Sequence, residues 1–319
     1  MLRYIKEYRW ADMWQMRENS RAKQLQSDVR MDGKLCVLTG GTSGVGWAAA
    51  KRLASHGARL VMVNRNAEKS NLACEKLRAS FGTECTYLLA DFSDLSQVRE
   101  AADQLADAHA RIDVLINNVG MHSTRLRRTA DGLETVFCVN HLASFLLTWK
   151  LLDTMRRSAP SRIIHVNSQG HRFGGLGVDD LGWEHRHYTG LRGYGASKTA
   201  QLLTVWEFAE ILEGSGVTIN AMHPGAVRSN IGGNNGPVYR WYKDRVLART
   251  LGDPSVSGQA IHYLATAPEL STVSGRYFNL THQEKPAPHA LDRQVGRDVW
   301  ERSLKLVGLA GQAITGCPE

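Results

Sequence analysis

The sequence predicts an α/β protein built on one doubly wound parallel sheet of about seven strands, flanked by helices and with a lid over its cleft. From residue 32 onward, short aliphatic or β-branched runs alternate with helical stretches of about 10 to 15 residues. A glycine-rich turn joins the first of these runs to the first helical stretch. Such alternation is typical of parallel strands that are joined by right-handed crossover helices.

Each element follows from its own local pattern. The strand candidates are apolar runs at residues 35–39, 59–63, 85–90, 112–117, 162–167, 217–222 and 276–280. The helix candidates between them lie at residues 45–57, 66–82, 95–109, 132–157, 194–214 and 254–268. The sequence shows no internal repeat, so we expect one domain with two tails. The expected parts are an N-terminal appendage at 1–31, a main domain at 32–285 with a lid at about 226–250, and a C-terminal tail at 286–319.

The composition is that of a globular protein, with 43% hydrophobic residues among 319. No stretch approaches about 18 uninterrupted apolar residues, and the first ten residues carry charges where a signal peptide needs an apolar run. We therefore expect a cytoplasmic protein. No histidine pair has the spacing of a metal site, so no metal is expected. The cysteines lack C-x-x-C spacing and are interpreted as buried, reduced thiols: Cys36, Cys74, Cys85, Cys138 and Cys317.

The formal net charge of +8 raises the question of a nucleic-acid partner. The basic residues are dispersed, with local excess only at 125–128 and 238–250, and no zinc-finger, helix-turn-helix or RRM pattern accompanies them. We interpret the charge as a solvated face and expect no nucleic-acid partner. A phosphate-bearing ligand and an anionic bilayer surface are the alternatives.

The stretch TGGTSGVG at residues 39–46 lies between the first strand candidate and the first helix candidate. A strand, a glycine-rich turn and a helix N-terminus together present backbone N–H groups to a pyrophosphate, as in Rossmann dinucleotide-binding folds. The spacing Gly-x-x-x-Gly-x-Gly differs from the common G-x-G-x-x-G, and a tight turn for close helix packing is the alternative. The expected cofactor-binding residues here are Gly40, Thr42, Ser43, Gly44, Val45 and Gly46.

The end of the second strand indicates which dinucleotide is bound. A free ribose 2′-hydroxyl is usually met there by an acidic residue, but this sequence has Asn64 and Arg65. Because a guanidinium pairs well with a phosphate, the sequence favours NADP(H) over NAD(H). The alternative is that Arg65 is merely solvated at the strand end.

The stretch GYGASK at 193–198 places Tyr194 four residues before Lys198 on one helix face. An ammonium beside a phenol favours the phenolate, and bringing a tyrosine from about 10 to near neutrality requires a pKa shift of roughly 3 units. Lys198 and a cationic cofactor could supply this shift together. The alternative is a packed aromatic side chain beside a solvated lysine.

Five motifs in this order resemble the short-chain dehydrogenase/reductase superfamily: TGGTSGVG, NNVG at 117–120, VNS at 166–168, YGASK at 194–198 and HPGAV at 223–227. Residues 129–148, 223–231 and 298–309 resemble its retinol-dehydrogenase branch. The resemblance covers roughly residues 32–310. Three departures from the branch are Val119 for the usual Ala, Ala143 and Ser144 for the usual Gly-His, and Ser229 for the usual Thr.

The resemblance implies an oxidoreductase with four catalytic residues. Tyr194 would be the general acid or base, and Lys198 would lower its pKa and hold the nicotinamide ribose. Ser168 would orient the substrate oxygen, and Asn140 would hold a water that links Lys198 to solvent. The resemblance also implies cofactor contacts through Asp91, Phe92, Asn117, Asn118, Gly120, Pro224, Gly225, Val227 and Ser229.

Two variable segments would select the substrate: the loop at 169–193 and the lid at 228–251. Their apolar and aromatic residues predict a small hydrophobic carbonyl or alcohol, such as a ketone, aldehyde, retinoid, steroid or other lipid. The lid and the N-terminal segment could also contact a membrane surface. The alternative is that the tail docks on its own domain or on a second subunit of a homo-oligomer. A non-catalytic NADP-binding sensor on the same fold is the alternative function.

Overall fold

The computed structural model describes residues 4, 7, 9–228 and 251–312. Most of the predicted lid, together with Ser229, lies outside the described residues.

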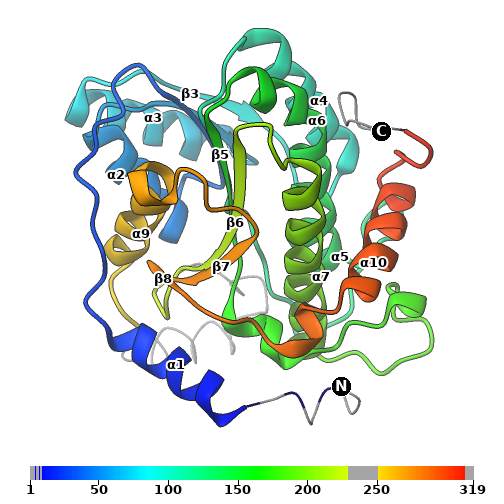
Figure 1. Cartoon of the computed structure of the whole chain (residues 1–319). Coiled ribbons are helices and arrows are strands. Elements are labelled where there is room, and N and C mark those ends of the chain that lie inside the picture. Colours follow the sequence, from blue (N-terminus) through cyan, green and yellow to red (C-terminus); the bar gives the residue numbers. More distant parts are fainter. Residues whose placement is uncertain (1–3, 5–6, 8, 229–250, 313–319) are drawn as a thin grey trace.

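The central element is an eight-stranded sheet in the order β3-β2-β1-β4-β5-β6-β7-β8 (Figure 1). All neighbouring strands are parallel except for β7 and β8, which are antiparallel. The strands are β1 (Leu35–Thr39), β2 (Arg59–Asn64), β3 (Cys85–Leu89), β4 (Val114–Asn117), β5 (Ser161–Val166), β6 (Val217–His223), β7 (Arg276–Asn279) and β8 (His282–Gln283). The predicted doubly wound sheet is confirmed. Strand β8 has only two residues, too few to give a recognisable sequence pattern.

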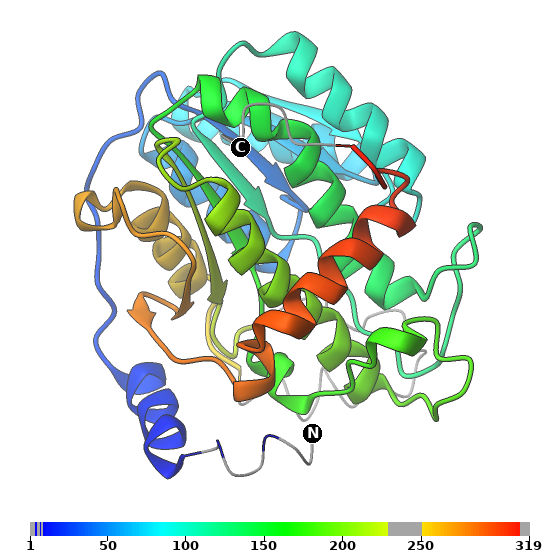
Figure 2. The same ribbon diagram turned by 45° about the vertical axis from the view of Figure 1, so that its right-hand side comes forward.

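Helices cover both faces of the sheet (Figures 1 and 2). One face packs on α2 (Gly44–Ser55), α3 (Ala67–Phe81) and α9 (Ser255–Thr266). The other face packs on α4 (Leu95–Ala108), α5 (Thr135–Phe137), α6 (Ala143–Arg157), α7 (Gly190–Ile211) and α10 (Arg293–Leu306). Because both faces are covered, strands such as β1 are buried at every residue, which explains their continuous apolar runs.

The helix predicted at 132–157 begins later and has an irregular turn. It runs from Thr135 to Arg157 as α5, a π-helical segment at Cys138–Leu142, and α6. By length and composition this is the one helix among the described residues that could cross a membrane, but 83% of its apolar window is buried inside the protein. Core helices commonly have this character.

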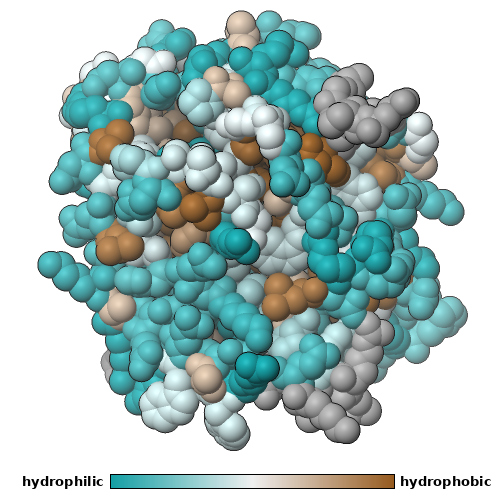
Figure 3. Space-filling view, viewed as in Figure 1, coloured by the Kyte–Doolittle hydropathy of each residue, from teal (hydrophilic) through white to brown (hydrophobic). Residues whose placement is uncertain are grey.

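The N-terminal helix α1 (Trp10–Arg21) lies against the β7–β8 edge of the sheet (Figure 1). Its contacts are polar: Asn19 Nδ2 donates to the backbone oxygen of Gln283 at 3.3 Å, and Asp12 pairs with Lys285 at 3.4 Å. Trp10 and Trp14 point into solvent. The α1 segment therefore docks on its own domain, and contact with a membrane stays a prediction. The surface in Figure 3 is mostly hydrophilic, with scattered rather than continuous apolar residues.

The C-terminal segment contains helix α10, which packs along α7 (Figure 2). The Trp300 ring of α10 lies 5.0 Å from the Phe145 ring of α6 and 4.7 Å from the Phe208 ring of α7, measured between centroids. Val299 and Leu304 of α10 are buried in the same cluster. Helix α10 thus completes the core on this face of the sheet.

We predict that Trp300→Ala lowers the free energy of unfolding by about 3–5 kcal/mol, because it leaves a cavity between α6, α7 and α10. The matched control is Trp10→Ala, since Trp10 is 84% exposed and its replacement is expected to change stability by less than about 0.5 kcal/mol. Urea unfolding of both variants measures the difference. Equal stability of the two variants would show that α10 is not part of the cooperative core.

Candidate active site

The candidate site lies at the carboxyl ends of the parallel strands, where β1 and β4 are neighbours. The chain crosses to opposite sides of the sheet at this point, because β1 is followed by β2 on one side and β4 begins the other side. In doubly wound sheets, ligands bind in the crevice formed at such a switch point.

The glycine-rich turn after β1 has the geometry that its sequence predicts. Gly40 and Gly44 have positive φ angles of +72° and +53°, which glycine adopts without strain. A Cβ on Gly46 would overlap the carbonyl oxygen of Gly40. Only glycine therefore allows α2 to begin so close to the turn. Thr42 and Ser43 form the partly exposed rim of this turn, and Val45 is buried beneath it.

The end of β4 is fastened to this turn by two side chains. The Asn118 amide donates to the backbone oxygens of Thr39 at 2.9 Å and Gly40 at 3.2 Å. The buried Thr39 hydroxyl accepts from the backbone N–H groups of Asn118 and Val119 at 2.8 and 3.0 Å. Sequence reasoning missed Thr39, although its place as the last strand residue before the glycines could have indicated it.

The end of β2 carries one buried donor without a partner, on Asn64, and one exposed cation, Arg65. Asn64 Oδ1 accepts from the backbone N–H of Gly41 at 2.9 Å, while its buried Nδ2 has no hydrogen-bond partner. Arg65 is exposed and makes no hydrogen bond or ion pair with the described residues. The exposed Arg65 guanidinium is available to a ligand that extends from the glycine-rich turn, whereas Asn64 Nδ2 is buried.

The predicted adenine-side residues divide into two groups. Asp91 is partly exposed and accepts from the backbone N–H and hydroxyl of Ser93 at 2.8 and 2.7 Å. Phe92 is buried in the core. The Asn117 amide donates to Thr148 Oγ1 at 2.9 Å and is buried. The Asn117 side chain thus points into the core, so only the backbone of this residue can border a nucleotide.

The nicotinamide-side residues follow β6. Gly225 has a φ of +86°, and a Cβ there would lie 3.3 Å from Leu280 Cδ2. The backbone oxygen of Pro224 accepts from the Ser257 hydroxyl at 2.5 Å. Val227 is buried and forms a parallel bridge with Gly252. These contacts fix the chain where it enters the segment outside the described residues.

Tyr194 and Lys198 lie on successive turns of α7. The Lys198 side chain is buried, and its Nζ donates to the backbone oxygen of Val166 at 2.9 Å and to Gln201 Oε1 at 3.3 Å. Burial lowers the pKa of Lys198 to about 7. The amine is thus held at the end of β5, beneath Gly120, where a Cβ would lie 3.8 Å from Nζ.

The predicted lowering of the Tyr194 pKa is wrong for this structure. Burial raises the pKa of Tyr194, and a hydrogen bond to Ser168 only partly opposes this effect. The physical reason is twofold: desolvation disfavours the phenolate, and the Lys198 amine is directed to Val166 and Gln201 instead of the phenol. Tyr194 is therefore protonated near neutral pH, in the form that a general acid requires.

Ser168 follows β5 and faces Tyr194. Its backbone N–H donates to Asn167 Oδ1 at 2.8 Å, and its hydroxyl accepts from the backbone N–H of Gly170 at 3.0 Å. A Cβ on Gly170 would overlap the Tyr194 ring. Sequence reasoning missed both Asn167 and Gly170. A glycine two residues after the strand-end serine was the available signal.

Asn140 lies in the π-helical segment, and its side chain is satisfied by protein groups. Its Nδ2 donates to the backbone oxygen of Met121 at 3.0 Å and to Ser197 Oγ at 2.9 Å. Its Oδ1 accepts from the Met121 backbone N–H at 2.7 Å. Its backbone oxygen accepts from Gln201 Nε2 at 2.9 Å. Asn140 was predicted to hold a water. Its backbone oxygen is instead bonded by Gln201, and its side chain is bonded by the β4–α5 loop.

A buried carboxylate supports the helix that follows Ser168, and sequence reasoning missed it. Glu284 has a fully buried side chain that pairs with Arg172 at 2.9 Å and accepts from Gln169 Nε2 at 2.6 Å. It also accepts from Asn279 of β7 at 2.9 Å and from Asn19 of α1 at 3.5 Å. One carboxylate thus connects the short helix after Ser168, the sheet edge and the N-terminal helix.

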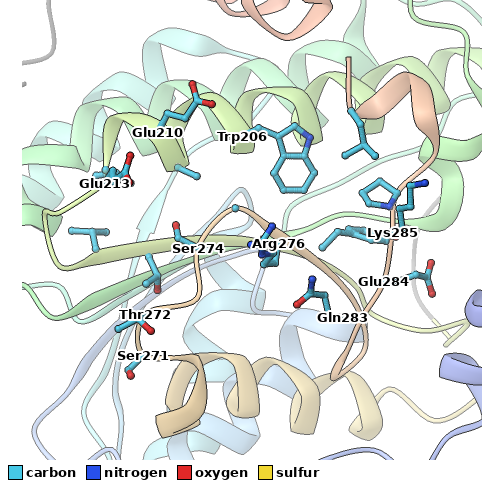
Figure 4. Close-up of a pocket in the computed structure, with 18 of the residues that line it drawn as sticks. Trp206, Glu210, Glu213, Ser271, Thr272, Ser274, Arg276, Gln283, Glu284 and Lys285 are labelled. Carbon is cyan, nitrogen blue, oxygen red and sulfur yellow. The ribbon is translucent and has the colours of Figure 1, made fainter. Parts of the chain in front are cut away.

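A separate groove of about 980 Å³ lies between the C-terminal half of α7 and the β7–β8 region (Figure 4). Its lining includes Trp206, Glu210, Arg276, Gln283 and Lys285. Ser168, Tyr194 and Lys198 do not line it. The groove therefore belongs to the sheet edge and not to the candidate site.

The profile of the short chain dehydrogenase family matches residues 34–238. The chain belongs to this family, as its motifs predicted, and it is an oxidoreductase that acts on CH–OH or C=O groups. It is 37% identical to human retinol dehydrogenase 13 over 92% of this chain and 90% of the relative. It is 36% identical to mouse retinol dehydrogenase 14 over 88% and 87%. The predicted retinol-dehydrogenase-like branch is confirmed.

Solved structures share the fold. A putative uncharacterized protein from Mycobacterium paratuberculosis is 26% identical and superposes with a TM-score of 0.73, covering 91% of this chain and all of that one. A short chain dehydrogenase from Burkholderia cenocepacia, solved in complex with NADP, is 25% identical, with a TM-score of 0.61, and covers 81% of this chain and 99% of that one.

The burial of Lys198 predicts a specific dependence of stability on pH. With a pKa of about 7 in the folded protein and about 10.4 in the unfolded chain, the lysine is protonated in both states below pH 7. Its burial then destabilises the fold by a constant amount. Between about pH 7 and 10.4 only the unfolded chain binds this proton, so stability rises with pH.

We predict that the stability of Lys198→Met does not show this rise with pH. The difference in free energy of unfolding between the variant and the wild type should shrink by up to about 4 kcal/mol from pH 7 to pH 10. Urea unfolding at four pH values measures it. Parallel curves for the two proteins would contradict the assignment of a buried, deprotonating lysine.

Proposed function

We propose that this protein is an NADP(H)-dependent oxidoreductase that interconverts the carbonyl and alcohol groups of small hydrophobic substrates. The observation that carries the proposal is the convergence of Ser168, Tyr194 and Lys198 beside the glycine-rich turn. The Ser168 hydroxyl and the Tyr194 ring both border Gly170, and Lys198 lies one turn of α7 further on.

The residues at the switch point fit a phosphorylated dinucleotide. Gly40, Gly44 and Gly46 leave room for a pyrophosphate at the N-terminus of α2. The exposed Arg65 guanidinium follows the end of β2, where a ribose 2′-phosphate would be recognised. This cation, and the absence of an acidic residue at positions 64 and 65, support NADP(H) over NAD(H).

The catalytic side chains have distinct tasks. Tyr194, kept protonated by burial, holds the proton for a substrate carbonyl oxygen at its hydroxyl. Ser168 orients that oxygen, because its own hydroxyl is held by Gly170 and Tyr194. Lys198 would hold a ribose hydroxyl of the cofactor. When bound, the nicotinamide supplies or accepts the hydride.

Apolar side chains flank the site and support a hydrophobic substrate. Phe173 ends the short helix after Ser168, and Leu191 lies in the first turn of α7; they are 49% and 58% exposed. Exposed large apolar residues beside a polar catalytic group are typical of substrate entrances. The relatives named retinol dehydrogenase are consistent with this class, which includes retinoids, steroids, ketones and aldehydes.

Tyr194→Phe tests the proposal. We expect kcat for reduction of hydrophobic carbonyls to fall by about 10²–10⁴, because the proton donor is lost, while the NADPH affinity stays largely unchanged. Absorbance of the nicotinamide and NADPH fluorescence report the two quantities. Tyr188→Phe is the matched control, since Tyr188 bonds Ser123 and Glu134 and not Ser168. Turnover that survives in Tyr194→Phe would overturn the proposal.

Arg65→Ala tests the choice of cofactor. We expect its dissociation constant for NADPH to rise by about 10- to 100-fold and that for NADH to change little, because a hydrogen-bonded charge pair with the 2′-phosphate is removed. Arg59→Ala is the control, since Arg59 lies at the opposite end of β2 and pairs with Glu84. Equal losses for NADPH and NADH would argue against recognition of the 2′-phosphate by Arg65.

A further inference from the structure

The Gln201 side chain of α7 is buried in the centre of the site and fills its hydrogen-bonding capacity. Its Nε2 donates to the backbone oxygen of Asn140 at 2.9 Å and to Ser144 Oγ at 3.2 Å. Its Oε1 accepts from Asn167 Nδ2 at 2.9 Å and from Lys198 Nζ at 3.3 Å. An amide offers two donors and, at its oxygen, two acceptor sites, so all four are used.

The chemistry of these partners fixes the orientation of the amide. The backbone oxygen of Asn140 can only accept, so it must face the Gln201 nitrogen. A Lys198 ammonium can only donate, so it must face the Gln201 oxygen. A flipped amide would break both contacts at once, inside a buried region where unpaired polar groups are costly.

Through these contacts Gln201 is connected to Lys198, to Asn140 and to the strand end that carries Ser168. It holds Lys198 directly and the Asn140 backbone directly. It also holds Asn167, whose Oδ1 accepts from the Ser168 backbone N–H at 2.8 Å. The strand end that carries Ser168 and the helix that carries Lys198 are therefore connected through one side chain.

Gln201 lies at the place where the family resemblance predicts a water between Asn140 and Lys198. The Asn140 side chain is not free for such a water, since Met121 and Ser197 satisfy it. Ser144, which stands where the branch usually has histidine, is small, and its hydroxyl oxygen accepts from Gln201. The local departure from the family pattern thus provides a partner for the amide.

We propose that Gln201 is a positioning residue that fixes the Lys198 amine and joins it to Asn140 in place of a water. The relevance of this positioning to catalysis rests on the proposed function. An amide N–H is not acidic near neutral pH, so Gln201 orients Lys198 without passing a proton to Asn140. A proton that leaves Lys198 must take another route to solvent.

A double-mutant cycle tests the contact without any measurement of activity. The variants are Gln201→Leu, Lys198→Met and the two combined, with free energies of unfolding measured at pH 6 and pH 9. We expect the coupling between the two positions to be larger at pH 6, where the lysine is charged, than at pH 9. A coupling that is equal at the two pH values, or absent, would overturn the proposal.

Titration of neighbouring groups does not contribute to the pH dependence of this coupling. His141 and His165 are the titratable side chains that face Lys198 from the π-helical segment and β5, and burial lowers the pKa of each to about 3. Both stay neutral between pH 6 and pH 9. Tyr194, on the same helix as Lys198, has a pKa raised by burial and stays protonated.

Gln201→Glu provides a second test if the leucine variant does not fold. The carboxylate keeps acceptors for Lys198 and Asn167 but cannot donate to Asn140, and its charge should raise the pKa of Lys198. We expect the lower end of the pH range over which stability rises to move upward by about one unit, while the upper end, which is set by lysine in the unfolded chain, stays in place. Thr204→Val is the control, because Thr204 is equally buried on α7 and bonds only backbone oxygens of its own helix. An unchanged pH range in Gln201→Glu would overturn the proposal.

Kinetics of NADPH oxidation with a hydrophobic aldehyde then test the catalytic meaning. We expect Gln201→Leu to lower kcat about tenfold with little change in KM, and Gln201→Glu to move the alkaline limb of the pH profile upward. A profile that matches the wild type in both variants would overturn the positioning role. A wild type that reduces no aldehyde would defeat the proposed function, while the stability cycle would still decide the contact.

Discussion

The buried Lys198 amine is the constraint on which the rest of the site depends. Removing an ammonium from water costs several kcal/mol unless protein groups replace the lost solvation. Here the backbone oxygen of Val166 and the amide of Gln201 replace it. Val166 ends β5, a strand with neighbours on both sides, so this acceptor is held rigidly. The position of the catalytic amine is thus set by the sheet and not by a loop.

The parallel sheet brings the other groups to the same edge. Because parallel strands end together, β1 presents the glycine-rich turn, β4 presents Asn118, and β5 presents Ser168 within one crevice. Side-chain hydrogen bonds then hold these strand ends and the segments that follow them in place. Asn118 fastens β4 to Gly40, and Glu284 fastens the helix after Ser168 to β7 and α1. These hydrogen bonds connect the strand ends that carry the proposed nucleotide-binding and catalytic residues to their neighbours in the sheet.

The sequence predicted the strands to within about two residues, because buried parallel strands read as continuous apolar runs. Short local motifs also singled out Ser168 and Lys198, whose catalytic roles stay predictions. The sequence could not predict Gln201, whose partner Asn140 is 61 positions away, or the pair of Glu284 with a residue 112 positions away. The Tyr194 pKa was predicted in the wrong direction because its dominant cause is burial, which depends on the packed fold and not on residue spacing.

The burial of Lys198 and the tight packing around Tyr194 both cost stability. This cost favours the proposal of a catalyst over that of a protein that only binds a nucleotide. A protein that merely bound a nucleotide would need the glycine-rich turn and a cation such as Arg65, but it would gain nothing from burying Lys198. It would also have no need for a glycine at position 170 that makes room for the Tyr194 ring. Proteins retain such destabilising arrangements mainly where a reaction requires fixed positions. The burial of Lys198 and the close packing around Tyr194 therefore support the proposal that a proton is transferred at a substrate oxygen.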